Sequence, residues 1–130
     1  MPADEARRLF TPEGERDWAG EHWDPVYPAG SSAPDGASVG TVFTTESSGG
    51  AATWVVVAAT ASRLAYARVV PGELGGTVDV TLTATDGGCR VDVAYDVTSL
   101  GPAGAGFVRE LESGFDEFLR GWQKAILDGV

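Results

Sequence analysis

The spacing of hydrophobic and polar residues changes twice along this chain of 130 residues. Residues 1–20 predict two short helices. The first is expected to begin after Pro2, because acidic residues occupy its first turn. The second is expected to begin at Thr11 and Pro12, because threonine is a common N-cap and proline fits the first helical position. Over residues 39–100 the hydrophobic residues tend to recur at every second position, which is typical of β-strands with one packed and one wet face. Beyond that range the spacing becomes helical.

Turn-forming residues divide the alternating region into short strands. Gly and Ser occupy 47–50, Pro71-Gly72 marks a bend, and Asp86-Gly87 with a second glycine is typical of a hairpin turn. Turns at a spacing of about eight to twelve residues predict an antiparallel meander. The strands are expected at residues 39–46, 53–58, 64–70, 77–83 and 90–97.

A single hydrophobic stripe with steps of three and four residues runs along the last segment. It predicts about five helical turns over residues 107–127, with a stop signal at Asp128-Gly129. The stripe consists of Phe107, Leu111, Phe115, Phe118, Trp122 and Ile126. So large an apolar surface must pack against another element of similar length, and we expect this element to be the sheet. We therefore expect one α+β domain over residues 1–130, in which a curved antiparallel sheet wraps around a long C-terminal helix.

Several stretches, in this order, carry a resemblance to a known superfamily. The most specific is 9–16 (LFTPEGER), which continues to Trp18 and is followed by 23–27 (WDPVY). The others are 40–45 (GTVFTT), 53–56 (TWVV), 66–72 (YARVVPG), 76–80 (GTVDV) and 90–98 (RVDVAYDVT). With the aromatic helix, they resemble the START/birch-pollen-allergen superfamily (SRPBCC), and within it the polyketide cyclase/dehydrase-like bacterial proteins. The resemblance covers nearly the whole chain and implies a helix-grip fold.

The resemblance also implies a function. Helix-grip proteins hold a cavity between sheet and helix, so we expect binding of a small hydrophobic ligand, such as a lipid, a polyketide or an aromatic metabolite. The candidate ligand-binding residues are Trp23, Tyr27, Tyr66, Arg68, Tyr95, Phe115, Phe118 and Trp122. Two alternatives stay open. One is a polyketide cyclase- or dehydratase-like enzyme with Arg68, Tyr66 and His22 as its polar groups, and the other is a protein-interaction module like the heat-shock-ATPase activators.

The chain departs from the superfamily pattern at its beginning. Members usually open with a β-strand that lies beside the last strand, whereas here a helix is expected almost from Met1. Without that first strand, the edge of the strand at 90–97 is bare, and proteins usually cover such edges. We therefore expect either a homodimer through this edge or a start site that has been placed too late.

Arg68 is the most informative polar residue of the predicted sheet. It shares a strand face with Leu64, Tyr66 and Val70, but the other face is also apolar, so alternation leaves its orientation open. Facing the cavity, Arg68 is a buried cation that needs a partner, such as a ligand carboxylate or enolate oxygen. Facing outward, it is a solvated surface residue. Glu46 on a neighbouring strand is a candidate partner across the sheet.

His22 is the one histidine of the chain, and with Asp24 nearby it is a candidate general acid or base. A half-exposed residue at the start of a strand is the simpler interpretation, because one titratable group rarely suffices for catalysis. No Ser-His-Asp set can be assembled. His22 and Cys89 lack the usual ligand spacing of a metal site, so we expect neither a metal ion nor a cofactor.

The balance of charged residues limits the classes of molecule that the protein is expected to bind. Nine Lys and Arg against nineteen Asp and Glu give a net charge of −10, and the excess is spread over both halves. Without a basic face, nucleic acid and anionic membranes are poor partners. Cys89 is the one cysteine, which excludes an intramolecular disulfide, and residues 1–5 do not look like a signal peptide. The longest apolar run, 54–59, is too short to span a bilayer. We therefore expect a cytoplasmic protein.

Overall fold

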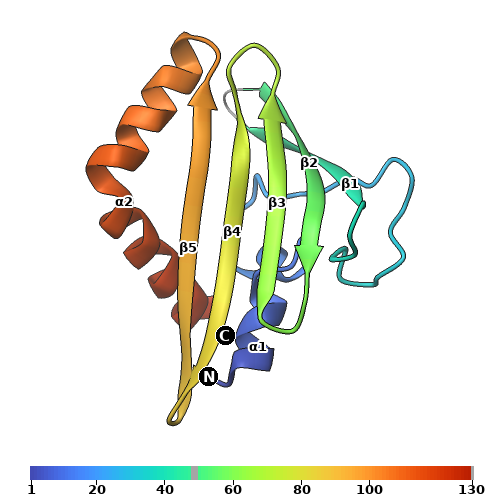
Figure 1. Cartoon of the computed structure of the whole chain (residues 1–130), viewed down its shortest axis with the longest axis vertical. Helices are drawn as coiled ribbons and strands as arrows, with labels where there is room; N and C mark the ends of the chain where they lie inside the picture. The colour runs from blue at the N-terminus through green and yellow to red at the C-terminus, as the bar shows by residue number, and fades with distance from the viewer. Residues whose placement is uncertain (48–49, 130) are drawn as a thin grey trace.

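A computed structural model gives the structure of the chain and describes residues 1–47 and 50–129. Within these residues the chain forms the helix α1 (Ala3–Leu9), the 3-10 turn η1 (Gly14–Asp17), five strands and the long helix α2 (Pro102–Gly129). The strands are β1 (Val42–Ser47), β2 (Gly50–Ala59), β3 (Arg63–Val70), β4 (Leu74–Thr85) and β5 (Gly88–Ser99). The fold is therefore α+β, with an antiparallel sheet and a long C-terminal helix in a helix-grip arrangement (Figure 1). The predicted fold class is confirmed.

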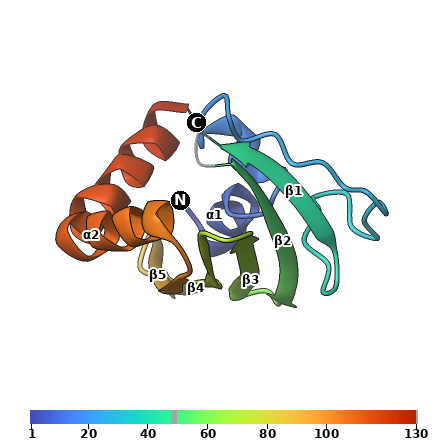
Figure 2. The same ribbon diagram turned by 90° about the horizontal axis from the view of Figure 1, so that it is seen from above.

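The sheet is a meander in which each strand pairs with the next one along the chain, in the order β1-β2-β3-β4-β5. All four pairs are antiparallel. The register of β2 with β3 shifts between Val56 and Ala58, an irregularity of the kind that bends a strand. Seen from above, the sheet curls around α1, which lies on its concave side (Figure 2).

The core lies on this concave face, because alternate strand residues point toward it. Phe43 and Trp54 stack with ring centroids 5.8 Å apart, and the ring of Tyr66 stands on edge to both. Phe43 is fully buried at 0% exposure. From the N-terminal segment, Phe10 and Trp18 pack edge to face at 5.6 Å and extend the same core. The short N-terminal elements thus supply the aromatic side chains that fill the curve of the sheet.

The helix α2 runs beside β5 (Figure 1). Its aromatic stripe contacts the sheet at Tyr95. Tyr95 on β5 meets the rings of Phe115 and Phe118 on edge, with centroids 5.9 Å apart in each pair. The ring of Trp122 also contacts that of Trp18 in the N-terminal segment, with centroids 5.5 Å apart. The backbone leaves helical geometry at Gly114 (φ −136°, ψ 26°), so α2 is kinked there. The predicted packing of the stripe against the sheet is confirmed.

Several predicted boundaries differ from the observed ones. The second N-terminal helix is only the single 3-10 turn η1, which has four residues. The last helix begins at Pro102 rather than at residue 107, since proline suits the first helical position and Glu73 accepts hydrogen bonds from the backbone N–H groups of Ala103 and Gly104. β1 begins at Val42, because Gly40 (φ 89°) turns the chain just before it. The predicted turn at 47–50 has its centre, residues 48–49, outside the described residues.

The strand β5 forms one edge of the sheet, and no described strand pairs with its outer side. Its register with β4 is unbroken from Gly88 to Ser99. The other edge strand, β1, is partly covered because Val26 forms an isolated antiparallel bridge with Thr44. Among the helices in residues 1–47 and 50–129, none combines the length and the apolar character that a membrane crossing requires.

Candidate functional site

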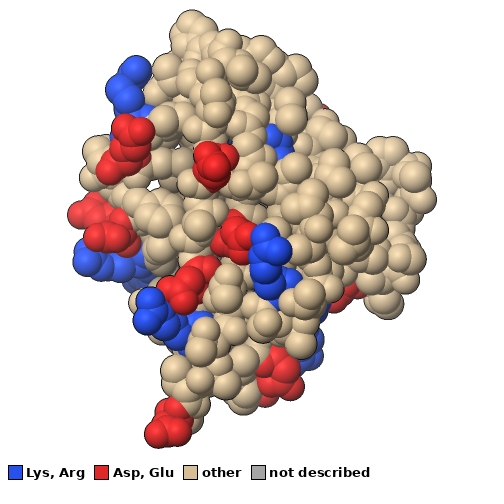
Figure 3. Space-filling view, viewed as in Figure 1, with Lys and Arg blue, Asp and Glu red and all other residues tan. Residues whose placement is uncertain are grey.

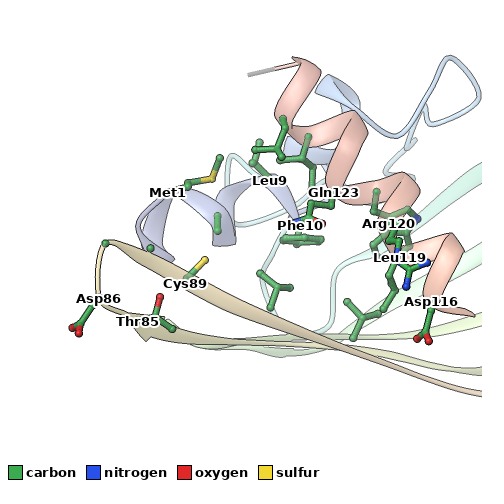
Figure 4. Close-up of a pocket in the computed structure, with 18 residues that line it drawn as sticks. Met1, Leu9, Phe10, Thr85, Asp86, Cys89, Asp116, Leu119, Arg120 and Gln123 are labelled. Carbon is green, nitrogen blue, oxygen red and sulfur yellow. The ribbon is translucent and has the colours of Figure 1, made fainter.

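A groove of about 600 Å³ lies between α1, the β4–β5 hairpin, β5 and the C-terminal half of α2 (Figure 4). We call it the α2 groove. Its apolar lining includes Phe10, Cys89, Val91, Val93, Trp122 and Ile126. It exists because the C-terminal half of α2 diverges from the beginning of β5, so that the alternate inward residues of this strand are only partly covered.

Five polar side chains also line the α2 groove. Asp116, Arg120 and Gln123 come from α2, and Thr85 and Asp86 come from the hairpin (Figure 4). All five are exposed. The interior of the groove therefore favours an apolar molecule, whose polar groups can meet side chains at the rim.

A smaller space of about 380 Å³ lies further along β5, beneath the N-terminal half of α2. It is lined by Tyr95, Val97, Leu111 and Phe115 among others. Tyr95 contacts α2 through its ring and is largely surrounded by apolar side chains. Burial raises the pKa of its hydroxyl, and Glu15 raises it further, whereas Arg68 lowers it. The Tyr95 hydroxyl is therefore neutral and able to donate a hydrogen bond.

The structure decides between the two orientations of Arg68 that the sequence leaves open: it lies on the inner face of β3. Its neighbours across the sheet are Trp54 and Gly76. The guanidinium carbon lies 5.0 Å from the ring centroid of Trp54 and 5.1 Å from that of Phe107. Burial lowers the pKa of this guanidinium. The expected pairing with Glu46 is wrong, because Glu46 is exposed on the outer face and β2 lies between the two strands.

Three other predicted site residues have structural partners. The Tyr66 hydroxyl donates a hydrogen bond of 2.8 Å to the backbone carbonyl of Phe10. The indole N–H of Trp23 donates to the backbone carbonyl of Pro12 at 2.8 Å, and the Tyr27 hydroxyl donates to Glu13 at 2.7 Å. The Tyr66 hydrogen bond ties the N-terminal segment to the sheet, and the other two hold that segment together. Trp23 and Tyr27 pack against Phe43 and do not line either groove.

His22 lies in a turn after η1 and is exposed. The nearby Asp24 is engaged by Arg16 at 2.6 Å rather than by His22. Within residues 1–47 and 50–129, no group of three His, Cys, Asp or Glu side chains is placed to share a metal ion. The role of His22 as an acid or base stays a prediction, and the geometry gives it no partner among the other predicted site residues.

Sequence reasoning missed Glu15 of η1. The residue is partly buried, and burial of its carboxyl raises the pKa well above the ordinary value. Its charge contributes to the raised pKa of both Tyr66 and Tyr95, so the carboxyl faces the interior of the fold. A single 3-10 turn has no periodicity that would show which of its residues points inward, and this is why the pattern did not reveal it.

Sequence reasoning also missed the part that α1 plays in the α2 groove. Leu9 and Phe10 line the groove together with Met1 (Figure 4). The sequence identifies Leu9 and Phe10 as an apolar helix face, but the pattern does not show which surface that face covers. On the side of the molecule shown in Figure 3, basic side chains lie beside acidic ones and form no patch of their own.

The fold and the grooves define a class: an α+β protein whose curved antiparallel sheet holds a long C-terminal helix, with apolar space between them. No family model matches the sequence. No curated protein matches it either. Among solved structures, protein MLL2253 from Mesorhizobium loti has a similar fold, with a TM-score of 0.67 and 17% sequence identity over 100% of this chain and 92% of that chain. At this identity the likeness shows the fold alone.

Proposed function

We propose that this protein binds a small hydrophobic molecule in the α2 groove. The observation that carries the proposal is the groove itself, with its volume of about 600 Å³ and its lining of apolar side chains between sheet and helix. Ligand pockets commonly have volumes of about 300–1,000 Å³, an apolar lining and few polar groups. The resemblance to the SRPBCC superfamily and its polyketide cyclase-like members supports the same function.

The enzyme alternative has one observation in its favour, the inward-facing cation Arg68. The two other polar residues expected in such an enzyme, Tyr66 and His22, are not placed to act together with Arg68. The hydroxyl of Tyr66 is engaged by a backbone carbonyl, and His22 is exposed in a turn. Binding without catalysis is therefore the better supported function.

The single cysteine of the chain gives a direct test, because Cys89 lines the groove and is a free thiol. N-phenyl-1-naphthylamine, an uncharged apolar fluorophore, should bind and slow the alkylation of Cys89 by N-ethylmaleimide. Native mass spectrometry before and after organic extraction should show whether the purified protein already carries a small molecule. No probe binding, together with an alkylation rate that the probe leaves unchanged, would overturn the proposal.

A pair of matched variants locates the bound probe. Val93→Phe places a larger side chain in the groove and should weaken probe binding at least ten-fold. Val69→Phe makes the same change on the outer face of β3, where Val69 is 45% exposed, and should leave binding within two-fold. Circular dichroism checks that both variants fold. If Val93→Phe does not fold, the Cys89 protection measured on the unaltered chain still decides the question.

A further inference from the structure

Arg68 is a cation on an apolar face. On its strand the residues of the same face, Leu64, Tyr66 and Val70, are all buried. The guanidinium lies against two aromatic rings, Trp54 from β2 and Phe107 from α2. Attraction between a cation and the face of an aromatic ring accounts for this approach. It brings the charge to the place where the sheet meets the beginning of the long helix.

The two rings provide no hydrogen-bond acceptor for the guanidinium of Arg68. A guanidinium has five N–H donors, and an aromatic ring carries no lone pair to accept them in the usual geometry. The buried Nε of Arg68 has no hydrogen-bond partner among the described residues. Arg63, on the outer face of the same strand, donates to the carboxylate of Asp79 at 2.6 Å. Buried donors are normally satisfied in proteins, so the lack of an acceptor at Arg68 needs an explanation.

The surroundings of Arg68 lie apart from the α2 groove. Arg68 pairs with Gly76, which in turn pairs with Val97 on β5. The groove reaches β5 at Val91 and Val93. Val97 lies four residue steps along the strand from Val93, which corresponds to about 13 Å. A site at Arg68 is therefore distinct from the groove and does not depend on the function proposed for it.

We propose that Arg68, Trp54 and Phe107 form a second binding site, which takes the carboxylate of a small aromatic acid. A carboxylate can accept two parallel N–H bonds from a guanidinium, including the bond from Nε. The aromatic body of the ligand would pack against the rings of Trp54 and Phe107, in the offset or edge-on contacts that such rings prefer. A bare inorganic anion has no such body and would leave the rings unused.

Two further features fit this ligand. Arg68 is partly exposed, so a small molecule can approach its guanidinium, and the side chains that cover the buried Nε must shift for that atom to donate. Tyr95 lies close enough to Arg68 for the cation to lower the pKa of its hydroxyl, against the larger effect of burial. Tyr95 and Arg68 also lie on the same face of the sheet. No acidic side chain among the described ion pairs competes for Arg68.

The test compares three probes by NMR titration: 2-naphthoate, 2-naphthamide and acetate. The first two have the same ring system and differ in charge, while acetate has the charge without the ring. We expect 2-naphthoate to shift the Nε–H resonance of Arg68 and to bind at least ten-fold more tightly than the other two. Absence of 2-naphthoate binding would overturn the proposal, and so would equal affinity for either of the other probes.

Variants assign the effect to Arg68. Arg68→Met should lower the affinity for 2-naphthoate at least ten-fold and bring it within two-fold of that for 2-naphthamide, and Arg68→Lys should retain part of the preference for the acid. Arg63→Met removes a cation from the outer face of the same strand and should leave the affinity within two-fold. An unchanged affinity in Arg68→Met would overturn the proposal. Because Cys89 protection reports on the α2 groove alone, failure of that site and failure of this one are distinguishable.

Discussion

The side-chain Oε2 of Glu73 accepts a hydrogen bond of 3.1 Å from the backbone N–H of Gly104. It also accepts one of 2.9 Å from Ala103. Glu73 stands in the turn between β3 and β4, so it caps a helix that begins almost thirty residues later. The negative carboxylate lies at the positive end of the helix dipole. This contact fixes the start of α2 against the sheet, three residues before Phe107.

Removing this cap should weaken the attachment of the helix. We expect Glu73→Ala to lower the free energy of unfolding by about 0.5–2 kcal/mol, as for other helix caps. Urea denaturation measures the change. Glu110→Ala, at an exposed position of the same helix, should change the stability by less than about 0.5 kcal/mol. Equal losses in the two variants would show that Glu73 does not act as a cap.

Two glycines at the start of α2 should respond in opposite directions to the same substitution. A Cβ at Gly104 would overlap the backbone carbonyl of Glu73, whereas a Cβ at Gly106 would meet nothing within 4 Å. Gly104→Ala should therefore destabilise the protein by about 1–3 kcal/mol. Gly106→Ala should stabilise it by up to about 1 kcal/mol, because alanine favours the helix. Thermal denaturation of both variants checks the difference in sign.

The sequence predicts the main elements because each has a periodic signal of its own. The apolar stripe from Phe107 to Ile126 needs a packing surface of similar length, and the sheet predicted from the alternating strands is long enough to supply it. The same pattern places Tyr95 on the inner side of the last strand, where its ring indeed contacts Phe115. Long elements with one buried face are predictable in this way, since burial dictates the period.

The details of the site depend on contacts between segments far apart in the chain, and periodicity carries no information about these. Arg68 has apolar neighbours on both faces of its strand, so only its contacts with Trp54 and with Phe107 on α2 show which way it points. Glu15 faces inward because Thr11 and its neighbours fold the segment into a single turn, with a hydrogen bond from Gly14 to the Thr11 hydroxyl. The capping of α2 by Glu73 likewise spans 31 residues.

The buried carboxyl of Glu15 should make stability depend on pH. The unfolded chain releases this proton near the ordinary pKa of about 4.3, whereas the folded protein holds it to a higher pH because burial raises the pKa. Between these values the folded state binds more protons than the unfolded state, so the contribution of Glu15 to stability falls as the pH rises.

Glu15→Gln removes this titration. The free energy of unfolding of the variant should equal that of the original chain at pH 4. It should be larger at a pH above the pKa that Glu15 has in the folded protein. Urea denaturation from pH 4 to 8 measures both. Glu21→Gln changes an exposed carboxyl in the following turn and serves as the control. If Glu15→Gln and Glu21→Gln give parallel stability profiles, the carboxyl of Glu15 is solvated rather than buried.

The homodimer through the last strand stays a prediction, and pairing opposite charges across the two copies of β5 gives it a specific register. In this register the two copies of β5 pair antiparallel, with Val93 of one copy opposite Val93 of the other. Arg90 of each copy would then lie opposite Asp96 of the other, and Tyr95 would lie opposite Val91 on the inner face. We expect sedimentation equilibrium to give twice the mass of one chain. Arg90→Asp should raise the dissociation constant about five- to thirty-fold through like-charge contacts, and Arg90→Asp combined with Asp96→Arg should restore it. A monomer at every concentration, or a double variant no tighter than the single one, would contradict this register.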